Sequence, residues 1–362
     1  MLTIEERIEE IEDEIRKTPY HKATEHHIGK LKARIARLKD EQIEKGFKSG
    51  GGGGKGFAVR KTGDASVVLV GPPSVGKSTL LNKITNADSK VAAYDFTTLG
   101  VIPGMLNYKG AKIQIFDVPG ILSGAASGKG RGKEVLSIAR NTDLIVITVD
   151  VKNIQSIPAI IKELHEAGVR LNERPPRVNI IKRTSGGLKV NSTTALKLNY
   201  DTIKALAAEF RLSNAEIVIK ENVSLERLID AFLGNRVYLP YLVVVNKIDL
   251  GIPKDLDKYV PEGANIVYLS AETGRNLDIF REKIWEKLEF IRVYLKKEEI
   301  DYDKPFILKK GQNLNSLLEL ISICTKDSFK GAKVYGPGAK FPGQEVSLTF
   351  QPQDETVVQF LG

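Results

Sequence analysis

The chain has 362 residues, 42% of them hydrophobic and 27% charged, which is ordinary for a soluble globular protein of two or three domains at about 100–200 residues per domain. Its single cysteine, Cys324, excludes an intrachain disulfide and fits a reducing, cytoplasmic location, and the longest apolar runs, such as Leu144–Val149, are too short to cross a bilayer. The net charge of +9 favours anionic partners such as nucleotide, RNA or a ribosome.

The N-terminal region, residues 1–48, predicts a helical hairpin. Apolar residues recur at the spacing of one helix face and resume after a break at Thr18–Pro19. The two stripes, which we expect to bury each other, are Ile4, Ile8, Ile11 and Ile15, then Ile28, Leu31, Ile35 and Leu38. The outer face of the second helix carries Lys30, Lys32, Arg34, Arg37 and Lys39. Two interpretations of this basic face stay open, a solvated surface and a surface that binds a polyanion.

A glycine-rich linker, residues 49–64, comes after the hairpin. Its run Ser49–Gly56 reads SGGGGGKG, and consecutive glycines do not hold one backbone conformation. We therefore expect the helical arm to move relative to the rest of the chain.

From Ala65 the sequence alternates between strand and helix patterns, which predicts a mostly parallel sheet covered by helices over residues 65–171 and 238–290. The expected strands are Ser66–Val70, Lys112–Phe116, Leu144–Asp150, Tyr241–Asn246 and Asn265–Leu269, and the expected helices include Lys77–Ile84, Lys133–Ala139 and Ile157–Ala167.

Two further units are predicted outside this alternation. Residues 172–237 are too many for one crossover and predict an inserted α/β subdomain, with strands at Val178–Lys182 and Glu216–Ile219 and a helix at Tyr200–Phe210. Residues 291–362 predict a small β-grasp domain with one helix, Leu314–Ile323. Its expected strands are Ile291–Leu295, Phe306–Leu308, Ala332–Tyr335, Glu345–Leu348 and Val357–Phe360.

The segment after the first strand predicts a phosphate-binding P-loop, because GxxxxGKS stands between a strand and a helix. Glycines let backbone N–H groups point at phosphate oxygens, and the helix N-terminus adds its positive dipole end. We expect Lys77 to contact the β and γ phosphates and the Ser78 hydroxyl to ligate Mg²⁺. The nucleotide-binding residues expected here are Gly71, Pro72, Pro73, Ser74, Val75, Gly76, Lys77, Ser78 and Thr79.

Two later segments predict the rest of the γ-phosphate site. Asp117 ends a strand, where its carboxylate is expected to hold a Mg²⁺-bound water, and Gly120 comes next with a backbone N–H for the γ-phosphate. Thr98 is the expected switch threonine, with Thr97 as second candidate and a surface-loop turn as the alternative. The expected metal-site residues are Ser78, Thr98 and Asp117, and the expected catalytic residues are Lys77, Thr98 and Gly120.

Guanine selectivity is predicted by Asn246, Lys247 and Asp249 of the NKID segment. A buried carboxylate at Asp249 accepts hydrogen bonds from N1–H and the 2-amino group of guanine, and adenine lacks both donors. Lys247 is expected to lie over the base. Ser270, Ala271 and Glu272 come after the next strand and are expected to bring a backbone N–H to the guanine carbonyl. The predicted cofactors are Mg²⁺ with GTP or GDP.

Hydrolysis is expected to be slow, because Ile121 stands where a glutamine usually orients the attacking water. The basic, glycine-rich segment Gly124–Gly132 is expected to be mobile and to become ordered on the γ-phosphate. Its cations Lys129 and Arg131 are interpreted as solvated, with stabilisation of transition-state charge as the alternative.

The motifs FTTLGVIPG, DVPGILSGAASGKGRGKEV, NKID and SAETG, with GPPSVGKSTLL, resemble the Obg-like GTPases, and most closely the archaeal form of the Drg (developmentally regulated GTP-binding) family. HKATEHHIGKLKARIARLK and TGDASV resemble that family too, so the resemblance covers nearly the whole chain. It implies a Ras-like G domain with a helical arm, a ribosomal-protein-like α/β insert and a C-terminal TGS domain of β-grasp fold. VYGPGAKFPGQEV and DETVVQFLG resemble strands of that TGS domain.

The resemblance also implies a link to translation and ribosome association, a regulatory protein partner, and a hydrophobic residue in place of the catalytic glutamine, which Ile121 fits. Some related GTPases bind an activating K⁺ through a P-loop asparagine. Ser74 stands at that position, so K⁺ as a cofactor stays open.

The leading prediction is a slow, Mg²⁺-dependent GTPase that acts as a molecular switch, with Tyr94–Leu99 and Gly120–Gly132 reporting the nucleotide state to a ribosome or RNA. The alternative is an RNA- or ribosome-binding adaptor that holds GTP structurally. A third hypothesis, an ATPase, is disfavoured by Asp249. Neither a membrane partner nor sequence-specific DNA binding is expected.

Overall fold

The structure, a computed structural model, describes residues 3–22, 24–49, 63–85, 102–118, 138–296, 304–321 and 329–361. Most of the predicted linker, both predicted switch segments and Cys324 lie outside these residues, as do Thr98, Gly120 and Ile121. The predicted helix Lys133–Ala139 is described only from residue 138.

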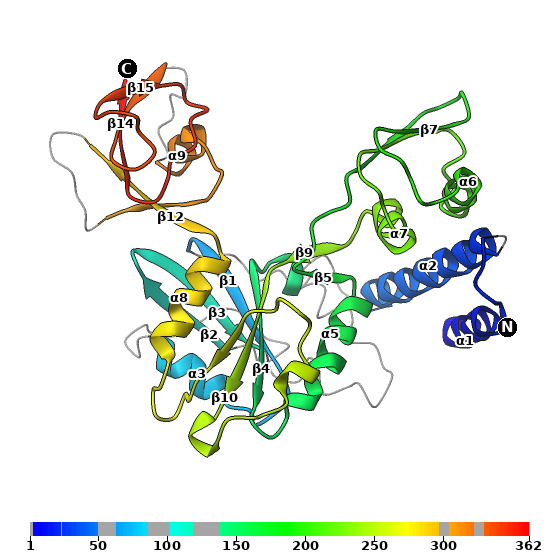
Figure 1. Ribbon diagram of the computed structural model, residues 1–362, viewed down its shortest axis with the longest axis horizontal. Coiled ribbons are helices and arrows are strands. Elements are labelled where there is room, and N and C mark those ends of the chain that lie inside the picture. Colours follow the sequence, from blue (N-terminus) through cyan, green and yellow to red (C-terminus); the bar gives the residue numbers. More distant parts are fainter. Residues whose placement is uncertain are drawn as a thin grey trace. The chain divides into compact units, whose positions relative to one another are not determined.

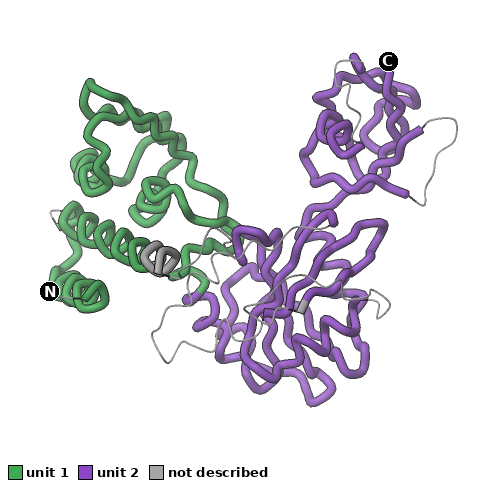
Figure 2. The backbone as a smooth tube through the Cα atoms, turned by 180° about the vertical axis from the view of Figure 1, so that it is seen from behind, with its two compact units in different colours: residues 1–56, 128–137, 164–238 green, residues 57–127, 138–163, 239–362 purple. Residues whose placement is uncertain are grey.

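The chain divides into two compact units (Figure 2). The arm–insert unit comprises residues 1–56, 128–137 and 164–238, and the sheet unit comprises residues 57–127, 138–163 and 239–362. No helix among the described ranges has both the length and the apolar character needed to cross a membrane.

A six-stranded sheet forms the centre of the sheet unit, in the order β11-β10-β4-β1-β3-β2 (Figure 1). β2 is antiparallel to β3, and the other adjacent pairs are parallel. All five predicted strands are confirmed within a residue or two, as β1 (Ala65–Val70), β3 (Ala111–Asp117), β4 (Leu144–Asp150), β10 (Tyr241–Asn246) and β11 (Ile266–Tyr268).

The strand β2 (Ile102–Tyr108) was not predicted, because Pro103 and Gly104 interrupt its apolar pattern. Its position at the edge of the sheet explains why a proline is tolerated there.

The core of this sheet results from the composition of its strands. All residues of β1, β4 and β10 are buried, as expected for strands covered on both faces. α3 (Lys77–Ile84) and α8 (Leu277–Lys287) contribute apolar side chains to one core cluster with β1, β3, β4 and β10. β4 is followed in the chain by η1 (Ile154–Ser156) and α5 (Ile157–Glu166), and β10 is followed by η2 (Ile248–Leu250) and η3 (Leu256–Lys258). α5 lies on the side of the sheet away from α8 (Figure 1).

The predicted insert has a three-stranded sheet of its own, in the order β6-β8-β7, entered through a two-stranded sheet of β5 and β9. The strands β6 (Val178–Lys182) and β8 (Ala215–Ile219) and the helix α6 (Tyr200–Glu209) confirm the prediction. β7 and α7 are additions, and α7 begins at the N-cap Ser224. The bounds of the remaining elements are β5 Val169–Leu171, β7 Leu188–Ser192, α7 Leu225–Leu233 and β9 Val237–Leu239.

Two helices form the N-terminal region, α1 (Ile4–Lys17) and α2 (Glu25–Ser49), and α1 begins with a capping box between Thr3 and Glu6. α1 packs against α2, as the two stripes predict. A second face of α2 packs against α6 and α7, where Ala33 is fully buried. The arm is therefore docked on the insert, a contact that the prediction of a freely moving arm did not include.

The C-terminal region forms a five-stranded sheet in the order β13-β12-β16-β14-β15, with α9 (Leu314–Leu320) packed on one face. β12 and β16 are parallel, and the other adjacent pairs are antiparallel. All five predicted strands are present, as β12 (Phe290–Leu295), β13 (Phe306–Lys309), β14 (Gly331–Tyr335), β15 (Gln344–Val346) and β16 (Thr356–Leu361). The helix ends at Leu320, three residues before the predicted end.

Candidate functional site

The predicted P-loop curls tightly between β1 and α3 because two of its positions accept only glycine. A Cβ atom on Gly71 would lie 1.9 Å from the carbonyl oxygen of Thr148 in β4. Gly76 has a φ of +89°, and a Cβ there would lie 2.5 Å from Nδ2 of Asn246. The loop backbone is therefore held against two neighbouring strands of the sheet.

Lys77, the first residue of α3, turns its ammonium group back into the loop. The side chain is buried, and its Nζ donates hydrogen bonds to the carbonyl oxygens of Gly71 at 3.0 Å and Pro72 at 2.8 Å. Burial lowers the pKa of Lys77, and the nearby negative charge of Asp117 opposes this shift. The geometry places one concentrated positive charge within the P-loop.

Ser78 and Asp117 lie next to each other beside that charge, with the Ser78 hydroxyl donating to Oδ2 of Asp117 at 2.5 Å. The other carboxylate oxygen of Asp117, Oδ1, is buried and accepts no hydrogen bond from any described group. Such an unsatisfied buried oxygen fits a hard cation or a water bound to it.

The described residues contain no cluster of three or more His, Cys, Asp or Glu suited to a metal ion. Mg²⁺ is usually held by one or two carboxylates together with substrate phosphates, so Ser78 and Asp117 fit the protein's share of such a site.

Asn246, at the end of β10, connects the P-loop to the segment after β11. Its Nδ2 donates to the carbonyl oxygen of Val75 at 2.9 Å, and its Oδ1 accepts from the backbone N–H groups of Lys247 at 2.8 Å and Ala271 at 2.9 Å. The N–H of Ala271, in the segment expected to bring a backbone N–H to the guanine carbonyl, is thus bonded to Asn246.

Asp249, expected to accept hydrogen bonds from guanine, lies in η2, and its side chain is exposed. Its Oδ1 accepts a hydrogen bond of 2.5 Å from the hydroxyl of Ser270, which is itself fully buried. Glu272, in the same segment as Ser270, is exposed as well.

Asp150 belongs to this cluster but was not predicted. It ends β4, in register with Asn246, and is only 5% exposed. Its Oδ2 lies 3.2 Å from Nζ of Lys247, and the same Nζ donates to the carbonyl oxygen of Ser74 at 2.6 Å. The available signal was an aspartate at the carboxyl end of a largely apolar strand.

The described part of the predicted site therefore comes together at one edge of the sheet. The P-loop comes after β1, Asp117 ends β3, Asn246 ends β10, and Ser270 lies just beyond β11, so segments far apart in sequence meet where parallel strands end. Thr98 and Gly120 lie outside the described residues.

The basic face of α2 is largely an intramolecular interface. Lys32 pairs with Glu226 of α7 at 2.7 Å, and Arg34 and Arg37 reach Glu209 of α6 at 3.5 and 3.1 Å. Lys39 lies 3.7 Å from Glu12 of α1. Lys30 is exposed and has no ion pair with a described residue. Four of the five basic side chains therefore pair with acids of the same unit while remaining partly exposed.

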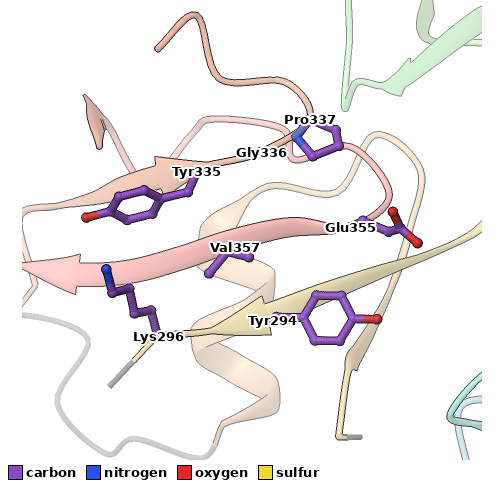
Figure 3. Close-up of a pocket in the computed structure, with 7 residues that line it drawn as sticks. All are labelled: Tyr294, Lys296, Tyr335, Gly336, Pro337, Glu355 and Val357. Carbon is purple, nitrogen blue, oxygen red and sulfur yellow. The ribbon is translucent and has the colours of Figure 1, made fainter. Parts of the chain in front are cut away.

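A separate pocket of about 400 Å³ lies on the C-terminal sheet (Figure 3). Its centre is a row of paired residues across three strands, Tyr294, Val357 and Tyr335. Nζ of Lys296 lies 4.6 Å from the centroid of the Tyr335 ring, and Glu355 accepts a hydrogen bond of 2.8 Å from Arg292. The charged groups of this pocket are thus engaged within the sheet.

Comparison with known proteins agrees with this site. Residues 66–183 match the family described as 50S ribosome-binding GTPase, and residues 185–290 match the C-terminal region of the MMR_HSR1 domain. An uncharacterized GTP-binding protein of Methanocaldococcus jannaschii is 49% identical, over 99% of this chain and 93% of that protein. Developmentally-regulated G-protein 3 of Arabidopsis thaliana is 44% identical, over 100% of this chain and 99% of that protein.

The human developmentally-regulated GTP-binding protein 2 is 40% identical, and the match covers 98% of both chains. Since such identities extend over nearly the full length of archaeal, plant and animal proteins, the chain belongs to the family of developmentally regulated GTP-binding proteins, the Drg family.

Proposed function

We propose that this protein binds GTP and GDP with Mg²⁺ and hydrolyses GTP slowly as a molecular switch. The observation that carries the proposal is the cluster of Lys77, Ser78 and Asp117 at the P-loop, in which Asp117 keeps a buried carboxylate oxygen without a described hydrogen-bond donor. Membership of the Drg family and the names of the GTP-binding relatives support the same function.

Phosphate binding is explained by the positions of these groups. The Lys77 ammonium now donates to two neutral carbonyl oxygens, and a charged phosphate oxygen is a stronger acceptor at the same place. The N-terminus of α3 adds backbone N–H groups and the positive end of the helix dipole. Ser78 and Asp117 would hold Mg²⁺, which supplies neutralisation of phosphate charge when it is bound.

Recognition of the base is proposed for Asp249, Ser270 and Asn246, which lie at or just after the ends of β10 and β11. The Asp249 carboxylate accepts hydrogen bonds from the N1–H and 2-amino groups of guanine, and the Ser270 hydroxyl keeps it oriented. Adenine would leave this carboxylate without a donor once the base covers it, which disfavours ATP. Asn246 keeps the P-loop and the Ala271 segment in register.

Slow turnover is the part of the proposal that depends on sequence alone. Ile121 has no polar atom with which to orient a water molecule, so the hydrolytic water is positioned by another group or by a partner. Thr98 and Gly120 are the proposed γ-phosphate contacts, and K⁺ dependence is a property to measure in the same assay.

The biological role proposed is in translation, through ribosome or RNA association and with a regulatory protein, in the cytoplasm. The net charge of +9 and the match to a family described as ribosome-binding support it. The order of the C-terminal sheet supports a TGS-type β-grasp domain at residues 291–362. The remaining proposed domains are the arm at 1–48, the G domain at 65–171 and 238–290, and the insert at 172–237.

Turnover of GTP with Mg²⁺ tests the enzyme proposal against the variant Lys77→Ala. We expect the wild-type protein to release phosphate slowly and the variant to lose this activity, because the positive charge within the P-loop is gone. Equal release from both proteins would contradict hydrolysis at this site. Tight guanine-nucleotide binding without any turnover would instead favour an adaptor that holds GTP structurally.

A further inference from the structure

The side chain of Lys247 is held at both the P-loop and β4. Its backbone has a φ of +61°, directly after β10 ends, and its Nζ donates to the Ser74 carbonyl oxygen at 2.6 Å. The second partner is Oδ2 of Asp150 at 3.2 Å, a charged acceptor. A lysine whose ammonium group is bound by two acceptors has few accessible rotamers, so its methylene chain keeps one conformation beside the proposed base site.

The two oxygens of Asp150 have different partners. Oδ1 accepts from the backbone N–H of Lys152 at 3.1 Å and from Nδ2 of Asn153 at 2.7 Å, and both bonds stabilise the turn after β4. Oδ2 lies at Lys247. One oxygen therefore has a structural role in its own loop, and the other reaches a neighbouring strand.

Because Asp150 is buried, its contact with Lys247 has a larger effect on free energy than a contact at an exposed residue would have. The residue is 5% exposed, whereas the Lys247 side chain is 34% exposed and faces the sheet edge. A buried carboxylate without a cation is costly, so Asp150 favours the lysine conformation that keeps the ammonium group in place. Asp150 and Asn246 are also register partners, which brings the lysine after Asn246 within reach.

We propose that Asp150 is a positioning residue for the base site: it holds the Lys247 ammonium group at the Ser74 carbonyl, so that the lysine lies preorganised along the guanine ring and joins the base site to the P-loop. This inference rests on the proposed binding of guanine nucleotides. It assigns a share of the affinity for guanine nucleotides to a residue outside the expected sequence motifs.

The variant Asp150→Asn isolates this role. Asparagine keeps one carbonyl oxygen for Lys152 and Asn153, but it removes the negative charge from Lys247. Titration of the full-length protein with a fluorescent guanosine diphosphate in Mg²⁺ buffer should show about tenfold weaker binding, because a charge-assisted hydrogen bond is lost. The thermal midpoint of the nucleotide-free protein should be unchanged, since the turn keeps its bonds.

The double mutant with Lys247→Met tests the route of the effect. Methionine keeps an apolar chain beside the base and lacks the ammonium group, so Asp150→Asn should cause no further loss in that background. A loss of the same factor in both backgrounds, or wild-type affinity in Asp150→Asn, would overturn the proposal. Wild-type protein that fails to bind guanosine diphosphate would contradict the proposed function itself.

The matched control is Asp143→Asn, at the opposite end of β4. Asp143 also pairs with a lysine, Lys309, at 3.0 Å, and it also bonds a backbone N–H, that of Ser66. Its loss of charge should leave nucleotide affinity at the wild-type value. A tenfold loss in this control as well would show that any aspartate–lysine pair on β4 matters, and would overturn a specific role for Asp150.

Discussion

Single buried polar groups set the distances between segments at the carboxyl edge of the sheet. Asn246 is 2% exposed and uses both atoms of its amide, one toward Val75 and one toward Lys247 and Ala271. Because a buried amide without partners costs free energy, the residue favours the one arrangement that satisfies it. The P-loop is therefore held by a residue far away in the sequence, and a change at either end should be felt at the other.

Gly76→Ala tests this dependence at the P-loop. The new methyl group would stand 2.5 Å from Nδ2 of Asn246, in a backbone with φ of +89°. We expect a loss of several kcal/mol in unfolding free energy, since left-handed strain of about 1–2 kcal/mol adds to the displacement of Asn246. Urea unfolding followed by the fluorescence of Trp285, the single tryptophan and a member of the sheet core, measures it.

The control for that prediction is Gly263→Ala. Gly263 has a similar φ of +76°, but a Cβ there would meet no atom within 4 Å. The control should lose only the strain of about 1–2 kcal/mol. Equal losses in the two variants would show that contact with Asn246 does not matter.

At the residue scale, the sequence singled out Lys77, Ser78 and Asp117 from local motifs, and the structure brings these three side chains together. The sequence did not single out Asp150, which pairs with Lys247. Exposure and ion pairing depend on the residues that a neighbouring strand brings alongside. The pairing of Asp150 with Lys247 spans 97 positions, so no local pattern reveals it.

The element scale is dominated by the docking of α2 on the insert. Gly29 and Ala33 make a narrow face, on which a Cβ at position 29 would lie 3.3 Å from Leu225. Small residues let the helices approach closely, and ion pairs of Lys32 and Arg37 flank the contact. The arm and the insert therefore form one packed unit, and basic residues of α2 contribute ion pairs to it.

Ala33→Asp should undock the arm. Ala33 is fully buried between α2 and the insert, and an unpaired carboxylate in that place costs several kcal/mol. Limited trypsin digestion should then cleave the lysine- and arginine-rich α2 much faster than in the wild type. His26→Asp, an acidic change at an exposed position of the same helix that removes no trypsin site, is the control and should leave the rate nearly unchanged.

The contact between α8 and β2 predicts that the stability of the protein depends on pH. Glu282 of α8 accepts hydrogen bonds from Lys109 at 2.7 Å and from Tyr108 of β2 at 2.6 Å. The hydrogen bond from Lys109 has the largest effect and that from Tyr108 the next largest, and both hold the pKa of Glu282 below its ordinary value of 4.5. Burial and the same carboxylate raise the pKa of Tyr108 to about 12.

Because the folded pKa of Glu282 is depressed, its contribution to stability is complete above the ordinary pKa and is lost as the pH falls through the folded value. Glu282→Gln should therefore lower the unfolding free energy at pH 7 by up to about 1 kcal/mol, a modest effect because solvent screens the pair. The difference from wild type should decrease as the pH falls below 4.5. Urea titrations at several pH values measure it, and a difference independent of pH would exclude this pair as its cause.

On the scale of the whole molecule, the two units differ in their capacity to be stabilised by a nucleotide. The P-loop cluster and Trp285 both belong to the sheet unit, so tryptophan fluorescence reports the part that binds. A ligand that binds only the folded state adds about 2.7 kcal/mol at a concentration of 100 times Kd.

The midpoint of thermal unfolding with GDP and Mg²⁺ should thus rise by several degrees over that of the nucleotide-free protein. Removal of Mg²⁺ with a chelator should reduce the shift, because Ser78 and Asp117 then lose their cation. Lys77→Ala should show little shift in either condition. If the chelator left the shift of the unfolding midpoint of the wild-type protein unchanged, a role for Asp117 in holding the metal would be contradicted.

The sequence by itself determined the parallel strands of the central sheet and the motifs in the loops after them. Buried parallel strands form nearly continuous apolar runs, and a P-loop needs glycine and lysine at set positions, so both leave local signals. The tertiary structure decided how distant segments meet: the docking of Ala33 on the insert, the pairing of Asp150 with Lys247 and the exposure of Asp249. These depend on packing between residues far apart in the chain, which no local spacing encodes.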